Sequence, residues 1–183
     1  ENWYNPSSLY TPGQQASGVL MDARVRISRC LGCLPKEIYF TSGGSEADNQ
    51  AILSAAAIGK RQGKMHIIST AFEHHAVLHT LKKLEKEGFE VTLLDVGESG
   101  IVDPSQLEKA IRPDTALVTI MYANNEIGTI QPIGEIGAVC RQNGVLFHTD
   151  AVQAAGHLPI NVKEDQIDML SLSAHKFNGP KGI

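Results

Sequence analysis

Apolar residues recur along this chain in two alternating patterns, one typical of helices and one typical of buried strands. Where they return every three or four residues, they predict helices with one buried face. Short, nearly continuous apolar runs lie between these segments and predict strands covered on both faces. The predicted helices are 17–31, 45–63, 75–88, one that begins at Asp103-Pro104, and 133–144; the predicted strands are 37–42, 65–70, 89–96, 115–122, 145–150 and 167–173.

Strands that alternate with helices of this length predict an α/β fold with a mostly parallel sheet, because each helix carries the chain back to start the next strand. Glycines stand where three of the predicted helices end, at Gly63, Gly88 and Gly144. With 183 residues and no internal repeat or linker, the chain is expected to form one domain. Ligands of such sheets bind outside the carboxyl ends of the strands, so the residues there are the first candidates for chemistry.

The composition narrows the classes of protein to consider. Hydrophobic residues make up 42% and charged residues 20% of the chain, as in an ordinary globular protein. A net charge of −4 gives no basic footprint for nucleic acid, and no apolar run approaches the length of a membrane span. The first residues, ENWYNPSSLY, lack the basic and apolar regions of a signal peptide, so we expect a cytoplasmic protein.

The three cysteines offer one recognisable spacing, the C-x-x-C of Cys30 and Cys33. This spacing occurs in redox pairs and in halves of zinc sites, but a zinc site needs a second ligand pair, and none stands at a suitable spacing. Both residues fall where the first predicted helix ends. Partly buried thiols without a special role are the simpler interpretation.

Small residues follow the predicted strand 37–42. Gly43 and Gly44 allow the backbone to approach a ligand closely, and Ser45 can cap the helix that begins there. The free N–H groups of such a helix start can bind an anion such as a phosphate. An ordinary glycine-rich turn with a serine cap is the alternative.

Histidines gather after the predicted strand 65–70, at His74, His75 and His79. The i, i+4 spacing of His75 and His79 occurs in zinc sites on helices. However, the zinc-protease pattern requires a glutamate directly after the first histidine, where this chain has Ala76. We therefore expect no metal here, and solvated histidines at a helix start are the alternative to a catalytic role.

The remaining strand ends carry amides, a carboxylate and a lysine. Asn124 and Asn125 follow the strand 115–122, and Asp150 ends the strand 145–150, with Gln153 shortly after it. A carboxylate at the end of a buried strand needs a partner, which is either a protein group or a protonated ring nitrogen of a ligand. Lys176 follows the last strand and is a surface charge, a phosphate ligand or a nucleophile.

Together these residues are the parts that a pyridoxal 5'-phosphate site requires. Such a site has a lysine that binds the aldehyde, a carboxylate for the ring nitrogen, a phosphate-binding helix start and a ring that stacks on the cofactor. Asp150 precedes Lys176 on consecutive strands, which fits the large domain of fold-type I enzymes. The combination therefore predicts pyridoxal phosphate as the cofactor.

Longer blocks of the sequence resemble the NifS/IscS-like cysteine desulfurases, members of the class V family of pyridoxal phosphate-dependent aminotransferases. The resemblance covers essentially the whole chain and includes EIYFTSGGSEADNQAI, FEHHAVL, MYANNEIGTIQPIGEI, FHTDAVQAAGHLPINV and SLSAHKFNGPKGI. It implies that Lys176 binds the cofactor covalently and moves a proton at the substrate α-carbon, and that His74 stacks on the ring and assists proton transfer. The other cofactor-binding residues that it implies are Asp150 at the ring nitrogen, Gln153 at the phenolic oxygen, Gly44, Ser45, Ser173 and His175 around the phosphate, and Asn125 near the ring and the substrate carboxylate.

The resemblance also implies a reaction and a larger enzyme. In the family, L-cysteine yields L-alanine, and its sulfur passes to an enzyme cysteine and on to a sulfur acceptor or scaffold protein for iron–sulfur clusters or thio-cofactors. Residues 1–183 would form the large, cofactor-binding domain, and the family's N-terminal segment, its nucleophilic cysteine loop and its small C-terminal domain lie outside this sequence. Such enzymes are usually homodimers, and this chain alone is expected to be inactive or weakly active.

Three alternatives remain open. The chain could belong to a selenocysteine lyase or another pyridoxal phosphate-dependent lyase, and its NPSS block is similar to that of selenocysteine lyases. It could bind the cofactor without turnover, or it could serve iron–sulfur assembly through interaction alone. The intact Lys176, Asp150 and His74 argue against loss of the cofactor.

Overall fold

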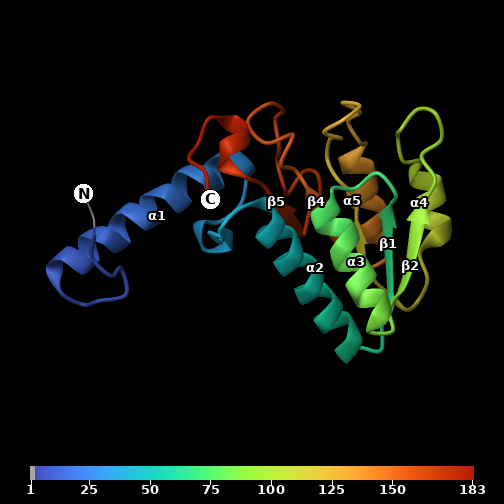
Figure 1. The fold of residues 1–183 in the computed structure, drawn as a ribbon, viewed down its shortest axis with the longest axis horizontal. Coiled ribbons are helices and arrows are strands. Elements are labelled where there is room, and N and C mark those ends of the chain that lie inside the picture. Colours follow the sequence, from blue (N-terminus) through green and yellow to red (C-terminus); the bar gives the residue numbers. More distant parts are fainter. Residues whose placement is uncertain (1–2) are drawn as a thin grey trace. The chain divides into compact units, whose positions relative to one another are not determined.

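The computed structural model describes residues 3–183, which divide into two compact units (Figure 1). The smaller unit runs to Phe40 and includes Ile160–Lys163, and the larger unit contains Thr41–Pro159 and Glu164–Ile183. The larger unit holds all five strands and every residue predicted to bind the cofactor.

The smaller unit is built on the long helix α1 (Thr11–Leu31), which is followed by the short 3-10 helix η1 (Pro35–Glu37). The helix begins earlier than predicted because a proline, Pro12, stands in its first turn, where the missing N–H costs nothing. At its other end the Leu31 carbonyl accepts the N–H of Val162 at 2.9 Å. That hydrogen bond joins the distant segment of this unit to the end of α1.

The strand predicted for residues 37–42 is wrong. Glu37 ends η1, and the residues that follow it pair with none of the five strands. The Ile38 carbonyl instead accepts a hydrogen bond from the Arg24 guanidinium at 3.2 Å, and the same guanidinium lies 5.1 Å from the centre of the Phe40 ring. Tyr39 between them is 75% exposed. The apolar run that suggested a strand is therefore held by contacts with α1 inside the smaller unit.

Five parallel strands form the sheet of the larger unit, in the order β2-β1-β3-β4-β5. The predicted α/β fold with a mostly parallel sheet is therefore confirmed. The order reverses at β1, which has β2 on one side and β3 on the other, and such a switch point opens a crevice at the carboxyl ends of the strands. The strands are β1 (His66–Thr70), β2 (Glu90–Leu94), β3 (Thr115–Thr119), β4 (Leu146–Asp150) and β5 (Met169–Ser171).

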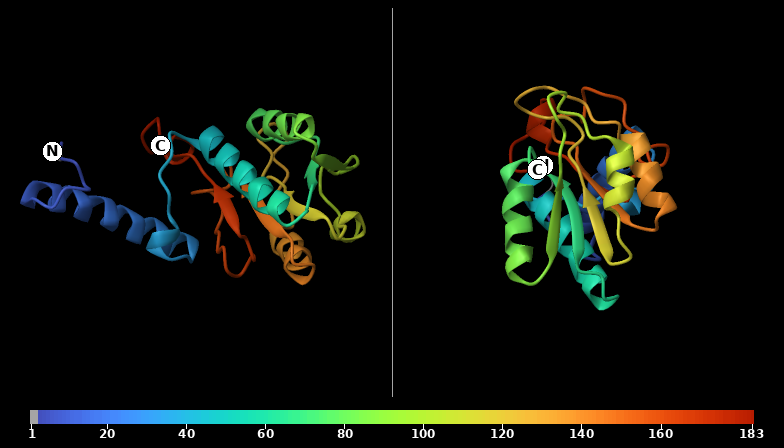
Figure 2. Two further views of the ribbon diagram at one scale, coloured as in Figure 1. Left: turned by 90° about the horizontal axis from the view of Figure 1, so that it is seen from below. Right: turned by 90° about the vertical axis from the view of Figure 1, so that its right-hand side faces the viewer.

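Four helices cover the sheet, with α2 packed against α3 on one face and α4 packed against α5 on the other (Figure 2). The helix predicted to begin at Asp103-Pro104 is α4, and Asp103 caps it, since its side chain accepts the Ser105 N–H at 2.8 Å. A glycine at positive φ follows the C-cap of three helices, at the predicted positions Gly63, Gly88 and Gly144. The helices are α2 (Gly44–Arg61), α3 (His75–Lys86), α4 (Pro104–Ala110) and α5 (Ile133–Gln142).

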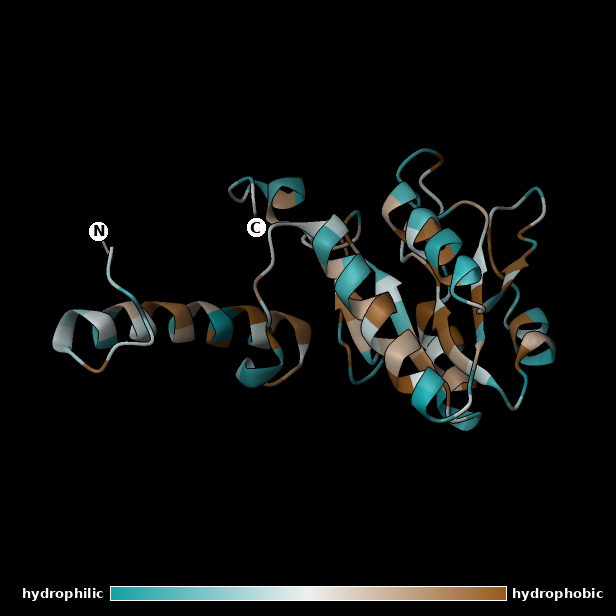
Figure 3. Cartoon of the chain, turned by 60° about the horizontal axis from the view of Figure 1, so that its bottom comes forward, coloured by the Kyte–Doolittle hydropathy of each residue, from teal (hydrophilic) through white to brown (hydrophobic). Residues whose placement is uncertain are grey.

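A hydrophobic core between α2, α3 and the sheet holds these layers together. Hydrophobic and hydrophilic residues alternate along α2 and α3, so each of these two helices has one side suited to the sheet (Figure 3). Burying one large aliphatic or aromatic side chain stabilises the fold by about 1.5–3 kcal/mol. In the described part of the chain no helix is long and apolar enough to cross a membrane. The core consists of Ile52, Ala55, Ala56, Ile67, Val77, Leu81, Leu84, Phe89 and Leu117.

Candidate functional site

A cavity of about 280 Å³ lies at the carboxyl ends of the strands in the larger unit. The segments after β1, β3, β4 and β5 line it, together with the first turns of α2. Its size is near the lower end of the range for small-molecule sites, roughly 300–1,000 Å³. The structure brings together in this cavity all nine residues predicted to bind the cofactor, whose separate roles stay predictions: Gly44, Ser45, His74, Asn125, Asp150, Gln153, Ser173, His175 and Lys176.

Lys176 reaches the cavity from a short 3-10 helix, η2 (Ala174–Phe177), which follows β5. Its N–H donates to the Ser173 carbonyl at 3.1 Å, and its own carbonyl lies 3.2 Å from His157 Nε2. These two contacts hold the backbone of the lysine, while its side chain is exposed. The amine is therefore accessible to a ligand in the cavity.

Asp150 ends β4 and forms part of the buried floor of the cavity. It is 5% exposed, and its Oδ1 accepts the Val152 N–H at 2.9 Å. Burial raises the pKa of Asp150, and the Val152 N–H opposes that rise. The nearby His74 and Lys176 also lower the pKa of Asp150, because positive charge stabilises the carboxylate. A buried carboxyl in this position favours a ligand that brings a positive charge.

His74 lies at the N-cap of α3, where its Nδ1 accepts the Ala76 N–H at 3.2 Å. This bond leaves Nε2 as the ring nitrogen that can exchange a proton with a ligand. His75 and His79 stack on each other, with ring centres 5.5 Å apart, and neither lines the cavity. Among residues 3–183, no three His, Cys, Asp or Glu side chains are placed to hold a metal ion.

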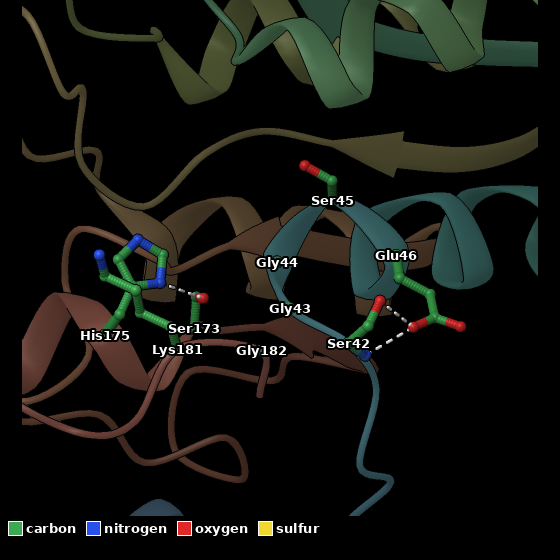
Figure 4. A pocket seen from close by; sticks show the side chains of 9 residues that line it. All are labelled: Ser42, Gly43, Gly44, Ser45, Glu46, Ser173, His175, Lys181 and Gly182. Carbon is green, nitrogen blue, oxygen red and sulfur yellow. Dashed lines mark hydrogen bonds between the residues drawn. The ribbon is translucent and has the colours of Figure 1, made fainter.

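A second cavity of about 390 Å³ adjoins the first around the start of α2 (Figure 4). The two share Gly44, Ser45, Ser173 and His175 among their lining residues. In Figure 4 the Ser173 hydroxyl and the His175 ring lie together on one side of the glycine turn, with Ser173 Oγ 2.9 Å from His175 Nδ1. Hydroxyl, imidazole and free helix N–H groups in one place suit an anionic ligand group.

The two glycines at the start of α2 keep this region open. Gly43 has φ 138°, a conformation that residues with a side chain rarely adopt. A Cβ on Gly44 would come 2.8 Å from Val152 Cγ2, closer than such atoms approach. On the far side of the turn, the backbone N–H and hydroxyl of Ser42 both donate to Glu46 Oε2 at 2.6 Å, which fixes the start of the helix.

The structure separates the two asparagines that the sequence offered together. Asn124 is buried, and its Nδ2 donates to the Phe72 carbonyl at 3.0 Å. Its Oδ1 accepts the N–H groups of Glu126 and Ile127 at 2.8 and 2.9 Å. Asn124 therefore shapes the loop, whereas Asn125 is exposed and lines the cavity.

Sequence reasoning missed two buried carboxyls near Asp150. Asp48 is 1% exposed and lines the cavity; burial, and to a smaller degree the charge of Asp150, raise the pKa of Asp48 to about 7. Burial raises the pKa of Glu73 to about 8. A signal existed for Asp48, because it falls four and seven residues before Ile52 and Ala55, on the buried stripe of α2.

Comparisons with known proteins agree with this arrangement. The family model described as Aminotransferase class-V matches residues 2–183. The chain is 55% identical over 183 residues to cysteine desulfurase IscS of Clostridium botulinum, and 56% identical over 182 residues to cysteine desulfurase IscS of Methanosarcina thermophila. These matches cover 100% of this chain but 46% and 45% of the two relatives, so the chain spans about half the length of the curated relatives that it matches.

Two solved structures with the same fold also match nearly the whole of this chain and about half of their own length. SspA in complex with cysteine superposes with a TM-score of 0.94 at 45% identity, over 99% of this chain and 52% of that chain. A NifS-like protein gives a TM-score of 0.94 at 40% identity, over 100% of this chain and 50% of that chain. The resemblance seen in the sequence is therefore confirmed.

Proposed function

Because the chain belongs to the aminotransferase class-V family, we propose that it is the pyridoxal 5'-phosphate-binding part of a cysteine desulfurase. The observation that carries the proposal is that Lys176, Asp150 and His74, from the ends of three different strands, line one cavity. The 55% identity to a protein named cysteine desulfurase IscS supports L-cysteine as the substrate. The structural neighbour SspA, which is described in complex with cysteine, supports it as well.

The residues present fit this cofactor. The glycine turn before α2 leaves the space that a side chain on Gly44 would fill, and the helix start, Ser173 and His175 offer donors for a phosphate. Asp150 offers a buried carboxylate for a protonated ring nitrogen. Lys176 offers an accessible amine for the aldehyde. The cavity thus supplies a partner for each polar end of the cofactor.

The side chains divide the work of the reaction. When bound, pyridoxal phosphate supplies an electron sink for the negative charge that develops at the substrate α-carbon. Lys176 would hold the cofactor through Nζ, and the same amine would move the proton at the substrate α-carbon. Asp150 would keep a proton on the ring nitrogen, and His74 would face the ring, with Nε2 available for proton transfer. Gln153 would donate to the phenolic oxygen, and Asn125 would orient the substrate carboxylate.

The sulfur-accepting group is placed elsewhere in this proposal. In the described part of the chain, none of the residues that line the two cavities is a cysteine. The match covers 46% of the IscS relative, and we assign the nucleophilic cysteine to the part of the enzyme that this sequence does not cover. This chain alone then binds the cofactor and has little or no desulfurase activity.

The proposal extends to the oligomeric state of the whole enzyme and to its location in the cell. We expect the whole enzyme to be a homodimer that passes sulfur to an acceptor or scaffold protein for iron–sulfur clusters, which light scattering and sulfur-transfer assays on that enzyme would test. A cytoplasmic location is supported by the free thiols of Cys30, Cys33 and Cys140. A relative from Dictyostelium discoideum is named as mitochondrial, so the alternative location is an organelle. Cell fractionation would distinguish the two locations.

Trapping the cofactor tests the proposal directly. Pyridoxal phosphate added to the purified chain should give an absorbance band at roughly 420 nm, and borohydride reduction should fix the label on Lys176 in a peptide map. Lys176→Ala should abolish the label, whereas the matched control Lys181→Ala, at the adjoining cavity, should keep it. A folded chain that is labelled elsewhere, or not at all, would refute the cofactor assignment.

A further inference from the structure

Asp48 lines the cavity beside Asp150, although the proposed function gives it no role. It projects from the second turn of α2, and its Oδ1 is buried without a hydrogen-bond partner. The Nε2 atom of His148 lies 3.7 Å from that oxygen, too far for a hydrogen bond. A buried carboxyl with an unpartnered oxygen is costly, so its ionisation depends closely on the groups around it.

His148, on β4, connects Asp48 to buried hydroxyl groups on the two neighbouring strands, β3 and β5. Its Nδ1 lies 2.8 Å from Thr119 Oγ1 on β3, and its Nε2 lies 2.9 Å from Ser171 Oγ on β5. A hydrogen bond with the Ser171 side chain also acts on Asp48, where it lowers the pKa of the carboxyl against the effect of burial. Burial lowers the pKa of His148 to about 3, so the ring is neutral near pH 7 and carries one proton, on Nδ1 or on Nε2.

Thr119, His148, Ser171 and Asp48 thus form a row of hydrogen bonds. Because the His148 ring is neutral and lies between two hydroxyls, the donors and acceptors of this row can be arranged in either direction. When Asp48 is ionised, Ser171 donates to it, Nε2–H of His148 donates to Ser171, and Thr119 donates to Nδ1. When Asp48 is protonated, it donates to Ser171, Ser171 donates to Nε2, and Nδ1–H donates to Thr119. Each direction satisfies the hydroxyls and both ring nitrogens, and no group in the row other than Asp48 changes its charge.

We propose that Asp48 is a positioning residue for the cofactor site, and that the row Thr119–His148–Ser171–Asp48 reverses with the charge on Asp48, so that the cavity floor carries one negative charge or two. The inference rests on the proposed function, since the second charge acts on the ring nitrogen that Asp150 holds. A second carboxylate strengthens the hold on a protonated nitrogen. The raised pKa of Asp48 places the reversal near neutral pH.

The surroundings of Asp48 include both signs of charge. β3 and β5 contribute the hydroxyls of the row, and α3 faces this part of α2 with the Thr80 hydroxyl, which donates to Asn49 at 2.7 Å. The titratable groups around Asp48 are His148 and Asp150 on β4, Glu73 and His74 after β1, and Lys176 on η2.

Nitrogen NMR of the histidine rings tests the row without any cofactor. In the ¹⁵N-labelled chain, we expect His148 to stay neutral from pH 5 to pH 9 but to move its proton from Nδ1 to Nε2, with a midpoint at about 7. Asp48→Asn should remove this pH dependence, whereas the matched control Glu73→Gln, another buried acid outside the row, should keep it. A His148 ring that keeps one tautomer at every pH, that takes a second proton, or that still changes in Asp48→Asn overturns the proposal.

A second arm separates this inference from the proposed function. With pyridoxal phosphate bound through Lys176, the protonated ring nitrogen should stabilise the Asp48 carboxylate and lower the midpoint by about one pH unit, a shift that Lys176→Ala should lack. Absence of the Lys176 adduct with the tautomer change intact would defeat the proposed function and leave the row standing. An adduct with an unchanged midpoint would overturn the positioning role of Asp48.

Discussion

Glu73 offers the sharpest test of the buried carboxyls, through the variant Glu73→Gln. Glu73 is 5% exposed, and its Oε1 accepts the Thr70 hydroxyl at 2.7 Å and the Met121 N–H at 2.9 Å. Its Oε2 is buried without a partner. A glutamine keeps the accepting oxygen in place and cannot ionise, so the variant isolates the cost of charging this site.

The expected change in the free energy of unfolding follows from the pKa of Glu73, which burial raises from its ordinary 4.5 to about 8. Between these values the folded chain holds a proton that the unfolded chain has lost, so stability falls as the pH rises. At about 1.4 kcal/mol per pH unit, the whole interval corresponds to about 5 kcal/mol. The new amide N–H groups of the glutamine lack partners and cost about 1–3 kcal/mol at every pH.

Urea unfolding followed by circular dichroism, at pH 5 and at pH 8.5, measures both effects. We expect Glu73→Gln to be less stable than the parent by about 1 kcal/mol at pH 5 and more stable by about 3 kcal/mol at pH 8.5. Glu85→Gln, at an exposed glutamate of α3, is the control and should show no such reversal. A difference between variant and parent that is the same at both pH values would refute the reasoning.

Three further predictions follow from packing and burial. Gly44→Ala should lower the free energy of unfolding by about 1–3 kcal/mol in urea titrations, because its methyl group meets Val152, and the added change Val152→Ala should restore most of the loss. His148→Ala should cost about 3 kcal/mol or more and His148→Gln clearly less, since glutamine can still bond a neighbouring hydroxyl; equal losses would contradict the hydrogen-bond row. Iodoacetamide at pH 8 should label the exposed Cys30 but not Cys140, which is 0% exposed and whose pKa burial raises to about 12; peptide mass spectrometry checks this, and equal labelling would contradict the burial of Cys140.

Much of the fold could be read from the sequence because periodicity and burial coincide in the larger unit. A strand such as β3 has an apolar centre and is buried at every position, as its sequence pattern predicts for a strand covered on both faces. The segment around Tyr39 shows where that reasoning stops. A segment forms a strand only where a neighbouring strand pairs with its backbone N–H and C=O groups. Here the Ile38 carbonyl instead accepts a hydrogen bond from the Arg24 guanidinium, and the local sequence pattern does not predict this contact.

The candidate site divides in the same way. Its exposed members, such as His74 and Lys176, lie within a few residues of strand ends, and the rule that ligands bind there was enough to find them. Asp48 and His148 lie inside a helix and a strand, where only the fold reveals that they meet across α2, β4 and β5. The pairing of strands, which the sequence order leaves open, decides which of these internal polar groups become neighbours.

The order of the strands also determines when the cavity can form during synthesis of the chain. Its lining begins at Gly44 and ends at Lys176, and β5, which carries the chain to that lysine, lies at the edge of the sheet. A growing chain therefore cannot assemble the cavity until almost all of the larger unit has left the ribosome. A ligand that contacts both ends of this interval binds only the finished unit, and at a hundred times its Kd it adds about 2.7 kcal/mol to stability. A supply of the ligand during synthesis therefore raises the fraction of finished chains that are folded.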